Sequence, residues 1–313
     1  MKFNQITQIL NLSKIMKFNY KAFGMVAAAS ALLSLQACSG SGSENKNQNQ
    51  GQEESGFAQV EEPTTFYLLP SPEDIFAFSA EKLKFSSQLL NPSENAGNYQ
   101  DSKSQEVNFG VYCADMAYCA VNGQYQDAAK YLKTLKELSS KLGLEAVFNQ
   151  KLSSRVDQHI EDKDSLKAIA NDTYIDIKKA LESQGKNATI AQISAGGWLE
   201  CMYIITNSIE SFSDTDLNIQ QIADEKNVFE SLMAYLGQYK SRPGIEETIN
   251  QLKPLEEAYN KLSVVFTEQT SNTTTSDGAI VIGGGKKIEI SEENFNLLKK
   301  RMAEIRTALI TNK

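Results

Sequence analysis

The chain reads GVYCADMAYCAV at residues 110–121, and a second stretch of the same design reads SAGGWLECMYII at residues 194–205. Each is an apolar run of helical character with a single acid, Asp115 or Glu200. Each also contains glycine, which costs about 1 kcal/mol relative to alanine inside a helix. Tight helix–helix contact would explain that cost structurally, and a ligand pressed against bare backbone would explain it functionally. Both explanations place these two helices in the most apolar part of the fold.

Helical signals continue on both sides of these stretches. Ser71-Pro72-Glu73-Asp74 combines an N-cap hydroxyl, a proline at the first helical position and acids near the positive end of the helix dipole. Gly143 and Gly185 end two later helices. The predicted helices cover about residues 71–83, 102–121, 126–142, 144–161, 165–184, 188–211, 214–240, 245–269 and 291–310. No clear break in composition separates them, so we predict one all-α domain over residues 65–313, a multi-helix bundle or array.

One segment near the C-terminus departs from the helical pattern. Residues 279–282 read AIVI and residues 286–290 read KKIEI, with three glycines between them. Branched residues on both sides of a glycine turn predict a small β-hairpin. An isolated hairpin is only marginally stable, so we expect this one to lie against the helical body.

Asp115 and Glu200 are the leading candidates for a functional site. If their helices pack together, both acids lie in apolar surroundings, where an unpaired charge is expensive. They could share a proton, bind a metal, or accept hydrogen bonds from nearby tyrosines. An acid on the solvent side of a half-buried helix would give the same pattern. The candidate ligand-binding residues are Asp115, Glu200, Tyr112 and Trp198, and no cofactor or resident metal is predicted.

Familiar catalytic patterns are missing from the sequence. His159 is the only histidine and has polar and charged neighbours, which is typical of a surface residue. A serine or cysteine triad would therefore have to use His159 as its base. Gly283-Gly284-Gly285-Lys286 lacks the glycine spacing and the following serine or threonine of a phosphate-binding loop. The sequence therefore predicts no catalytic residues.

Cysteine use is sparse. Cys113 and Cys119 fall on one predicted helix, where six residues rotate the chain by about 600° and raise it about 9 Å. They therefore cannot form a disulfide with each other there. We expect small buried hydrophobic residues at these positions and at Cys201, although a disulfide from Cys201 to either partner remains possible in an oxidising compartment.

The start of the chain indicates export. Lys17 and Lys21 precede an apolar run from residue 23 to residue 35, which is too short to span a membrane and is typical of a cleaved signal peptide. Residues 1–37 are assigned to this signal, with Met16 as the expected true start because the MKFN of residues 1–4 recurs at residues 16–19. Residues 38–64 are almost entirely polar and are expected to form a disordered tether.

Charge narrows the choice of partners. Residues 1–37 contain four of the 31 basic residues and no acid. The rest of the chain has 27 basic and 39 acidic residues and a net charge of −12. Such a surface repels nucleic-acid phosphates and anionic lipid head groups, so no nucleic acid is expected as a partner.

Leu35-Gln36-Ala37-Cys38 resembles the lipobox of bacterial lipoproteins, in which the cysteine is lipidated and becomes the first residue. The resemblance implies a triacylated Cys38 as membrane anchor. Ser39, the residue after this cysteine, resembles the residue at that position in lipoproteins released to the outer membrane. Segments 67–73, 110–117 and 194–200 also resemble helical lipoproteins of Bacteroidota that have no assigned activity. We therefore expect a lipid-anchored protein of the outer membrane or cell surface.

Two functions follow as hypotheses. The first is a non-catalytic binding or scaffolding module with an envelope protein as its possible partner, because the usual catalytic residue patterns are missing and a tether gives reach. The second is an enzyme, or a metal or small-ligand binder, that uses Asp115 and Glu200 in a pocket between glycine-lined helices. The separation and exposure of the two carboxyl groups discriminate between them.

Overall fold

The structure is a computed structural model that describes residues 69–79, 84–159, 161–266, 272–274, 280–282 and 286–311. The predicted signal peptide, Cys38 and the predicted tether lie outside these residues. The helices are α2 (Pro72–Ser79), α3 (Ser102–Val121), α4 (Tyr125–Leu142), α5 (Gln150–His159), α6 (Lys163–Ser183), α7 (Asn187–Ser208), α8 (Leu217–Gln238), α9 (Ile245–Tyr259) and α10 (Glu292–Thr311). Two short 3₁₀ helices, η2 (Ser87–Leu89) and η3 (Ser93–Asn98), precede α3. The all-α prediction is confirmed.

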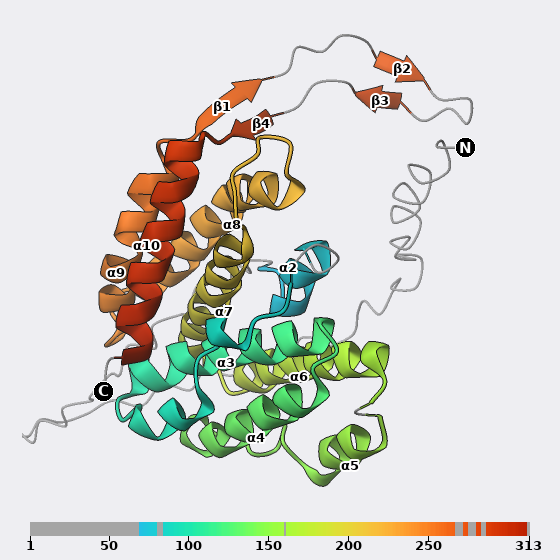
Figure 1. Ribbon diagram of the computed structural model, residues 1–313. Helices are drawn as coiled ribbons and strands as arrows, with labels where there is room; N and C mark the ends of the chain where they lie inside the picture. Colours follow the sequence, from blue (N-terminus) through green and yellow to red (C-terminus); the bar gives the residue numbers. More distant parts are fainter. Residues whose placement is uncertain are drawn as a thin grey trace, which may run out of the picture. The chain divides into compact units, whose positions relative to one another are not determined.

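Helices α3 and α7 form the centre of the helical body (Figure 1). Helices α4 and α6 pack against α3, with α5 against α6, while α8, α9 and α10 pack around α7. One continuous apolar core runs through all of these helices except α5. Nearly every residue of α3 and α7 is buried, which explains why these two helices are apolar on all sides rather than on one stripe.

The α3–α7 crossing depends on glycine. A Cβ atom on Gly110 would lie 1.9 Å from the carbonyl oxygen of Ile193, and one on Gly196 would lie 1.9 Å from the carbonyl oxygen of Val107. Real Cβ atoms do not approach backbone that closely. The two helices therefore touch backbone to backbone. Tight helix–helix contact, the structural explanation given above for these glycines, is confirmed.

The ends of the helices follow local signals. Helix α3 begins and ends at the predicted residues, and Asp101 caps it by accepting a hydrogen bond from the Ser104 amide at 3.0 Å. Gly143 ends α4 in the left-handed conformation, with φ at 73°. Helix α5 begins six residues later than the predicted 144, and Leu144 is instead a buried residue of the preceding turn.

The strands correct one prediction. The predicted partners at 280–282 and 286–289, β3 (Ile280–Ile282) and β4 (Lys286–Glu289), do not pair with each other. Strand β4 pairs antiparallel with β1 (Ser263–Phe266), and β3 pairs antiparallel with β2 (Asn272–Thr274). The helix expected to run to residue 269 ends at Tyr259, and β1 follows it. The reason is that Val264 and Val265 are β-branched and favour an extended strand.

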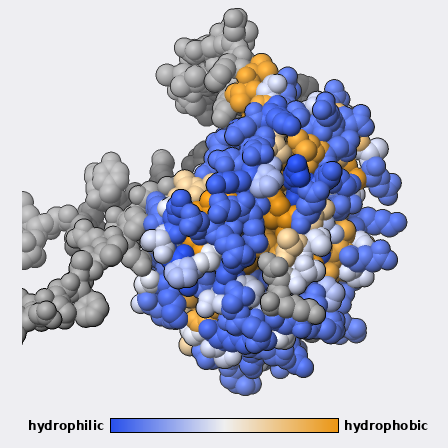
Figure 2. Space-filling model, turned by 90° about the vertical axis from the view of Figure 1, so that its left-hand side faces the viewer, coloured by the Kyte–Doolittle hydropathy of each residue, from blue (hydrophilic) through white to orange (hydrophobic). Residues whose placement is uncertain are grey.

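Part of this β structure rests on the helices, as expected. Strand β4 contacts α8, the Ile288 side chain is buried, and the Gln220 side-chain amide donates to the Ile288 carbonyl at 2.9 Å. The predicted glycine turn at 283–285 lies outside the described residues. On the face drawn in Figure 2, the surface is mostly hydrophilic and its hydrophobic residues form separate patches.

Candidate functional site

The structure brings Asp115 and Glu200 together at the α3–α7 contact. Both side chains are 0% exposed. Arg306 of α10 forms a two-bond ion pair with Glu200, its Nε at 2.9 Å from one carboxylate oxygen and its Nη2 at 2.7 Å from the other. The same Nη2 donates to the Leu89 carbonyl at 3.0 Å, and the guanidinium lies 4.5 Å from the centre of the Tyr203 ring. Arg306 therefore satisfies Glu200 completely within the core.

The surroundings of Asp115 favour the neutral form of its carboxyl group. Burial raises the pKa of its carboxyl well above the usual range, and the charge of Glu200 and a hydrogen bond with it raise the pKa further, against the opposing charge of Arg306. Its Oδ2 accepts a hydrogen bond from the Asn91 amide at 3.2 Å. The three groups thus form one buried network of two carboxyl groups and a guanidinium. The proton shared between Asp115 and Glu200, the first of the sequence-based alternatives, stays a prediction.

Tyrosines extend this network to the turn at residues 91–92. Tyr112 donates to the Pro92 carbonyl at 3.0 Å, and Tyr131 donates to the Asn91 carbonyl at 3.0 Å. The Asn91 side-chain amide donates to the Tyr99 hydroxyl at 3.0 Å. The rings of Tyr112 and Tyr131 lie 5.9 Å apart. These bonds fix the turn that delivers the Asn91 amide to Asp115.

Trp198 lies outside the network of Asp115, Glu200 and Arg306. It is two residues from Glu200 on α7, which turns it by about 200° to the far side of the helix. Its indole Nε1 donates to Glu225 Oε2 at 2.8 Å, and its ring lies 5.0 Å from that of Phe229. The predicted group of four therefore divides. Asp115, Glu200 and Tyr112 share one buried network, and Trp198 lies outside it.

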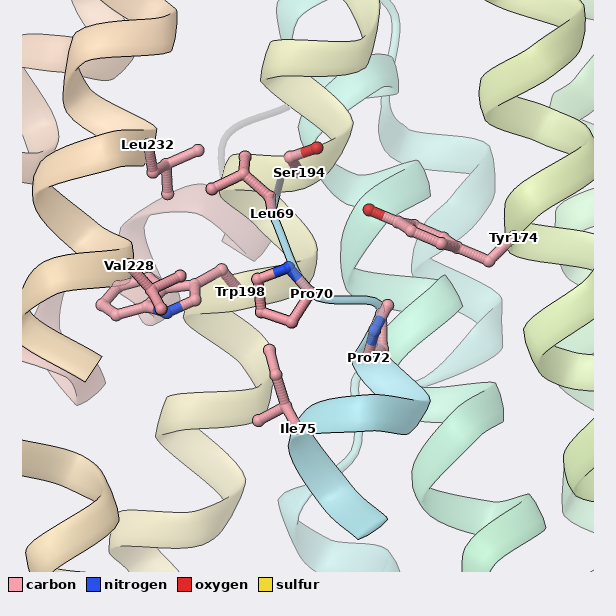
Figure 3. Close-up of a pocket in the computed structure, with 9 residues that line it drawn as sticks. All are labelled: Leu69, Pro70, Pro72, Ile75, Tyr174, Ser194, Trp198, Val228 and Leu232. Carbon is pink, nitrogen blue, oxygen red and sulfur yellow. The ribbon is translucent and has the colours of Figure 1, made fainter. Parts of the chain in front are cut away.

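Trp198 instead lines a small chamber between α6, α7 and α8 (Figure 3). The segment Leu69-Pro70 and the start of α2 close one side of this chamber. The hydroxyls of Tyr174 and Ser194 both point into it in Figure 3. Its free volume is about 10 Å³, which is room for about one water molecule.

The sequence reasoning missed Arg306, which completes the network. The signal that could have found it is a charge within the apolar stripe of the last helix. Leu298, Met302, Ile305 and Leu309 of α10 are all buried, and Arg306 follows Met302 at a spacing of four on the same face. A buried arginine requires a buried acid, and Asp115 and Glu200 were the available candidates.

The remaining candidates are accounted for. His159 is exposed, as predicted. Cys113, Cys119 and Cys201 are buried free thiols, and burial raises the pKa of each. Within the described part of the chain, no group of three or more acidic, histidine or cysteine side chains is placed to hold a metal ion.

The neutral Asp115 gives a testable pH dependence. The native state keeps a proton that the unfolded chain releases above a pKa of about 3.9. The contribution of Asp115 to the free energy of unfolding is therefore complete below about pH 4. It is lost, at up to about 1.4 kcal/mol per pH unit, as the pH rises toward the native pKa. In Asp115→Asn the amide can donate to Glu200 and accept from Asn91 without a titrating proton.

Urea unfolding of wild type and Asp115→Asn between pH 4 and pH 8 measures this effect. We expect the stability of wild type relative to the variant to fall as the pH rises. Asp176→Asn, which changes an exposed acid of α6, serves as the control and should run parallel to wild type. Parallel curves for Asp115→Asn and wild type would contradict a protonated Asp115.

No family model, curated protein or solved structure matches this chain. Among the described residues, no helix combines the length and the apolar character needed to cross a membrane.

Proposed function

We propose that this chain is a lipid-anchored protein of the bacterial cell envelope and that its helical body is a non-catalytic binding or scaffolding module. The observation that carries the proposal is the run of lysines, apolar residues and Leu35-Gln36-Ala37-Cys38, which resembles a lipoprotein signal. The polar composition of residues 39–64 supports it, because such a segment can serve as a tether between anchor and body. One acyl chain binds membranes only weakly, so stable anchoring requires the several chains typical of this lipoprotein class.

The arrangement of the two acids supports a structural use of the central site. Asp115 and Glu200 are both fully buried, and their hydrogen bonds are made to Asn91 and to Arg306. A substrate could reach Glu200 only by displacing Arg306. The network joins α3, α7 and α10, so its evident role is to hold the body in one conformation.

Metabolic labelling with a radioactive fatty acid tests the anchor. In a bacterial host, the wild-type chain should incorporate the label and sediment with membranes, because the Cys38 thiol accepts the lipid. Cys38→Ser should lose both the label and the membrane attachment. Ser43→Ala, which changes the neighbouring polar segment and keeps the thiol, should retain both. An unlabelled wild type, or a labelled Cys38→Ser, would overturn the proposal.

A further inference from the structure

An open cleft of about 490 Å³ lies between α2 and the first half of α8. This volume is in the range of natural ligand sites. Its apolar walls include Ile75, Leu217 and Val228, of which Leu217 is 60% exposed. Its carboxylates come from Asp74 of α2 and from Asp224 and Glu225 of α8. We call this site the acidic cleft.

The carboxylates of the acidic cleft have no cationic partner. None of the residues that line it is basic. Asp74 accepts hydrogen bonds from Ser71, and Asp224 accepts one from the Gln220 side chain at 3.1 Å. Neither these two acids nor Glu225 takes part in any ion pair of the described residues. Three acids from two helices thus face one opening without compensation.

Glu225 is the best-positioned of the three. Its side chain is only 9% exposed, and the indole of Trp198 fixes one carboxylate oxygen at 2.8 Å. The other oxygen has no hydrogen bond to a described residue. Burial and the neighbouring charge of Asp224 raise the pKa of Glu225. A cation placed in the cleft would offset both effects, because it favours the ionised carboxylate.

The acidic cleft adjoins the small chamber that Trp198 lines. The acidic cleft shares Pro70, Ile75 and Val228 with the small chamber in Figure 3, so these residues separate an outer and an inner space. In the inner space, the Ser194 hydroxyl is only 5% exposed and interacts with the Tyr174 hydroxyl, which points into the same chamber. The chamber has room for about one water molecule, which would complete the hydrogen bonding of these two hydroxyls.

We propose that the acidic cleft binds a basic segment of a partner polypeptide, a lysine or arginine with aliphatic neighbours. The inference rests on the proposed function as a binding module and names the chemistry of its partner. The positive side chain would approach Glu225 and Asp224, while aliphatic neighbours would cover Leu217, Ile75 and Val228. A polypeptide fits better than a small amine, since the acids come from two helices and lie among apolar side chains.

The test uses the complete mature chain with Cys38→Ser, which keeps it free of lipid, and a phage-displayed library of random heptapeptides. Peptides selected on this chain should be enriched in lysine or arginine next to aliphatic residues. Trp198 is the only tryptophan and is bonded to Glu225, so binding of a synthetic selected peptide should change its fluorescence.

Two matched variants locate the site. Asp224→Asn/Glu225→Gln should weaken the peptide at least tenfold, and Glu225→Gln still offers the indole an acceptor. Asp176→Asn/Glu182→Gln removes the same charge from the exposed surface of α6 and should leave the affinity unchanged. If both double variants lost affinity for the peptide equally, the loss would come from net charge alone, and the proposed site would be overturned.

Other outcomes also decide the proposal. Selection of acidic or uncharged peptides, no enrichment, or binding that ignores Asp224 and Glu225 would overturn it. Full competition by arginine methyl ester at the peptide's own concentration would reassign the cleft to small amines. The peptide test uses an unlipidated chain, so its failure leaves the anchor standing, and a failed labelling experiment leaves the cleft standing.

Discussion

Alanine at Gly196 is expected to prevent the native fold. The added Cβ would lie 1.9 Å from the Val107 carbonyl oxygen, which is backbone and cannot rotate away. Helices α3 and α7 would have to separate, and the core packed around both would lose contact throughout. Overpacking typically costs 1–3 kcal/mol, and a backbone clash at the central crossing should exceed about 3 kcal/mol.

Gly110→Ala should behave in the same way, because its Cβ would meet the Ile193 carbonyl oxygen. Gly237→Ala is the matched control, since that glycine is also helical and has nothing within 4 Å of the added atom. The control should be stabilised by up to about 1 kcal/mol through helix propensity. Circular dichroism and urea unfolding measure all three variants. A stable, cooperative Gly196→Ala would refute the close crossing.

Removal of Arg306 should have the second large effect. Arg306→Met keeps most of the side-chain volume but leaves Glu200 buried without its ion pair. Breaking a buried pair by removing one partner costs about 3–5 kcal/mol. Arg301→Met is the control on the same helix, because Arg301 pairs with Glu304 at the surface and such pairs contribute at most about 1 kcal/mol.

The double variant Glu200→Leu/Arg306→Met separates charge from packing. It removes both charges at once, and Asp115 can remain neutral beside the new leucine. Replacement of a whole buried pair by apolar residues is often neutral, so the double variant should be more stable than Arg306→Met alone. Urea unfolding of wild type, Glu200→Leu, Arg306→Met and the double variant gives the coupling energy of the pair directly. Additive losses would show that Arg306 and Glu200 do not act as a pair.

Much of the fold could be predicted because its signals are local. Gly143 and Gly185 lie directly beyond the helices that they were predicted to end, and both have positive φ. The apolar stretches around Asp115 and Glu200 predicted a contact between their helices, because glycine inside a helix and an acid in apolar surroundings both cost free energy that a close contact can offset. This information lies within a few residues of each feature.

The rest depends on distant parts of the chain. Arg306 lies 106 residues after Glu200, and the sequence around either residue does not identify the other as its partner. The strand at 263–266 takes its partner from 286–289, and without that partner its sequence is also compatible with the end of a helix. Trp198 was grouped with Glu200 by proximity in sequence, although helical rotation sends the two side chains to opposite sides. Pairings between distant segments require the folded structure.

The three buried thiols have a practical consequence. An alkylating reagent attacks thiolates, and Cys113, Cys119 and Cys201 are both shielded from solvent and kept protonated by burial. Modification can then proceed only during moments when the helices part. Peptide mapping of the alkylated chain would therefore measure the rate of alkylation at each cysteine, and that rate reports how often the region around it opens.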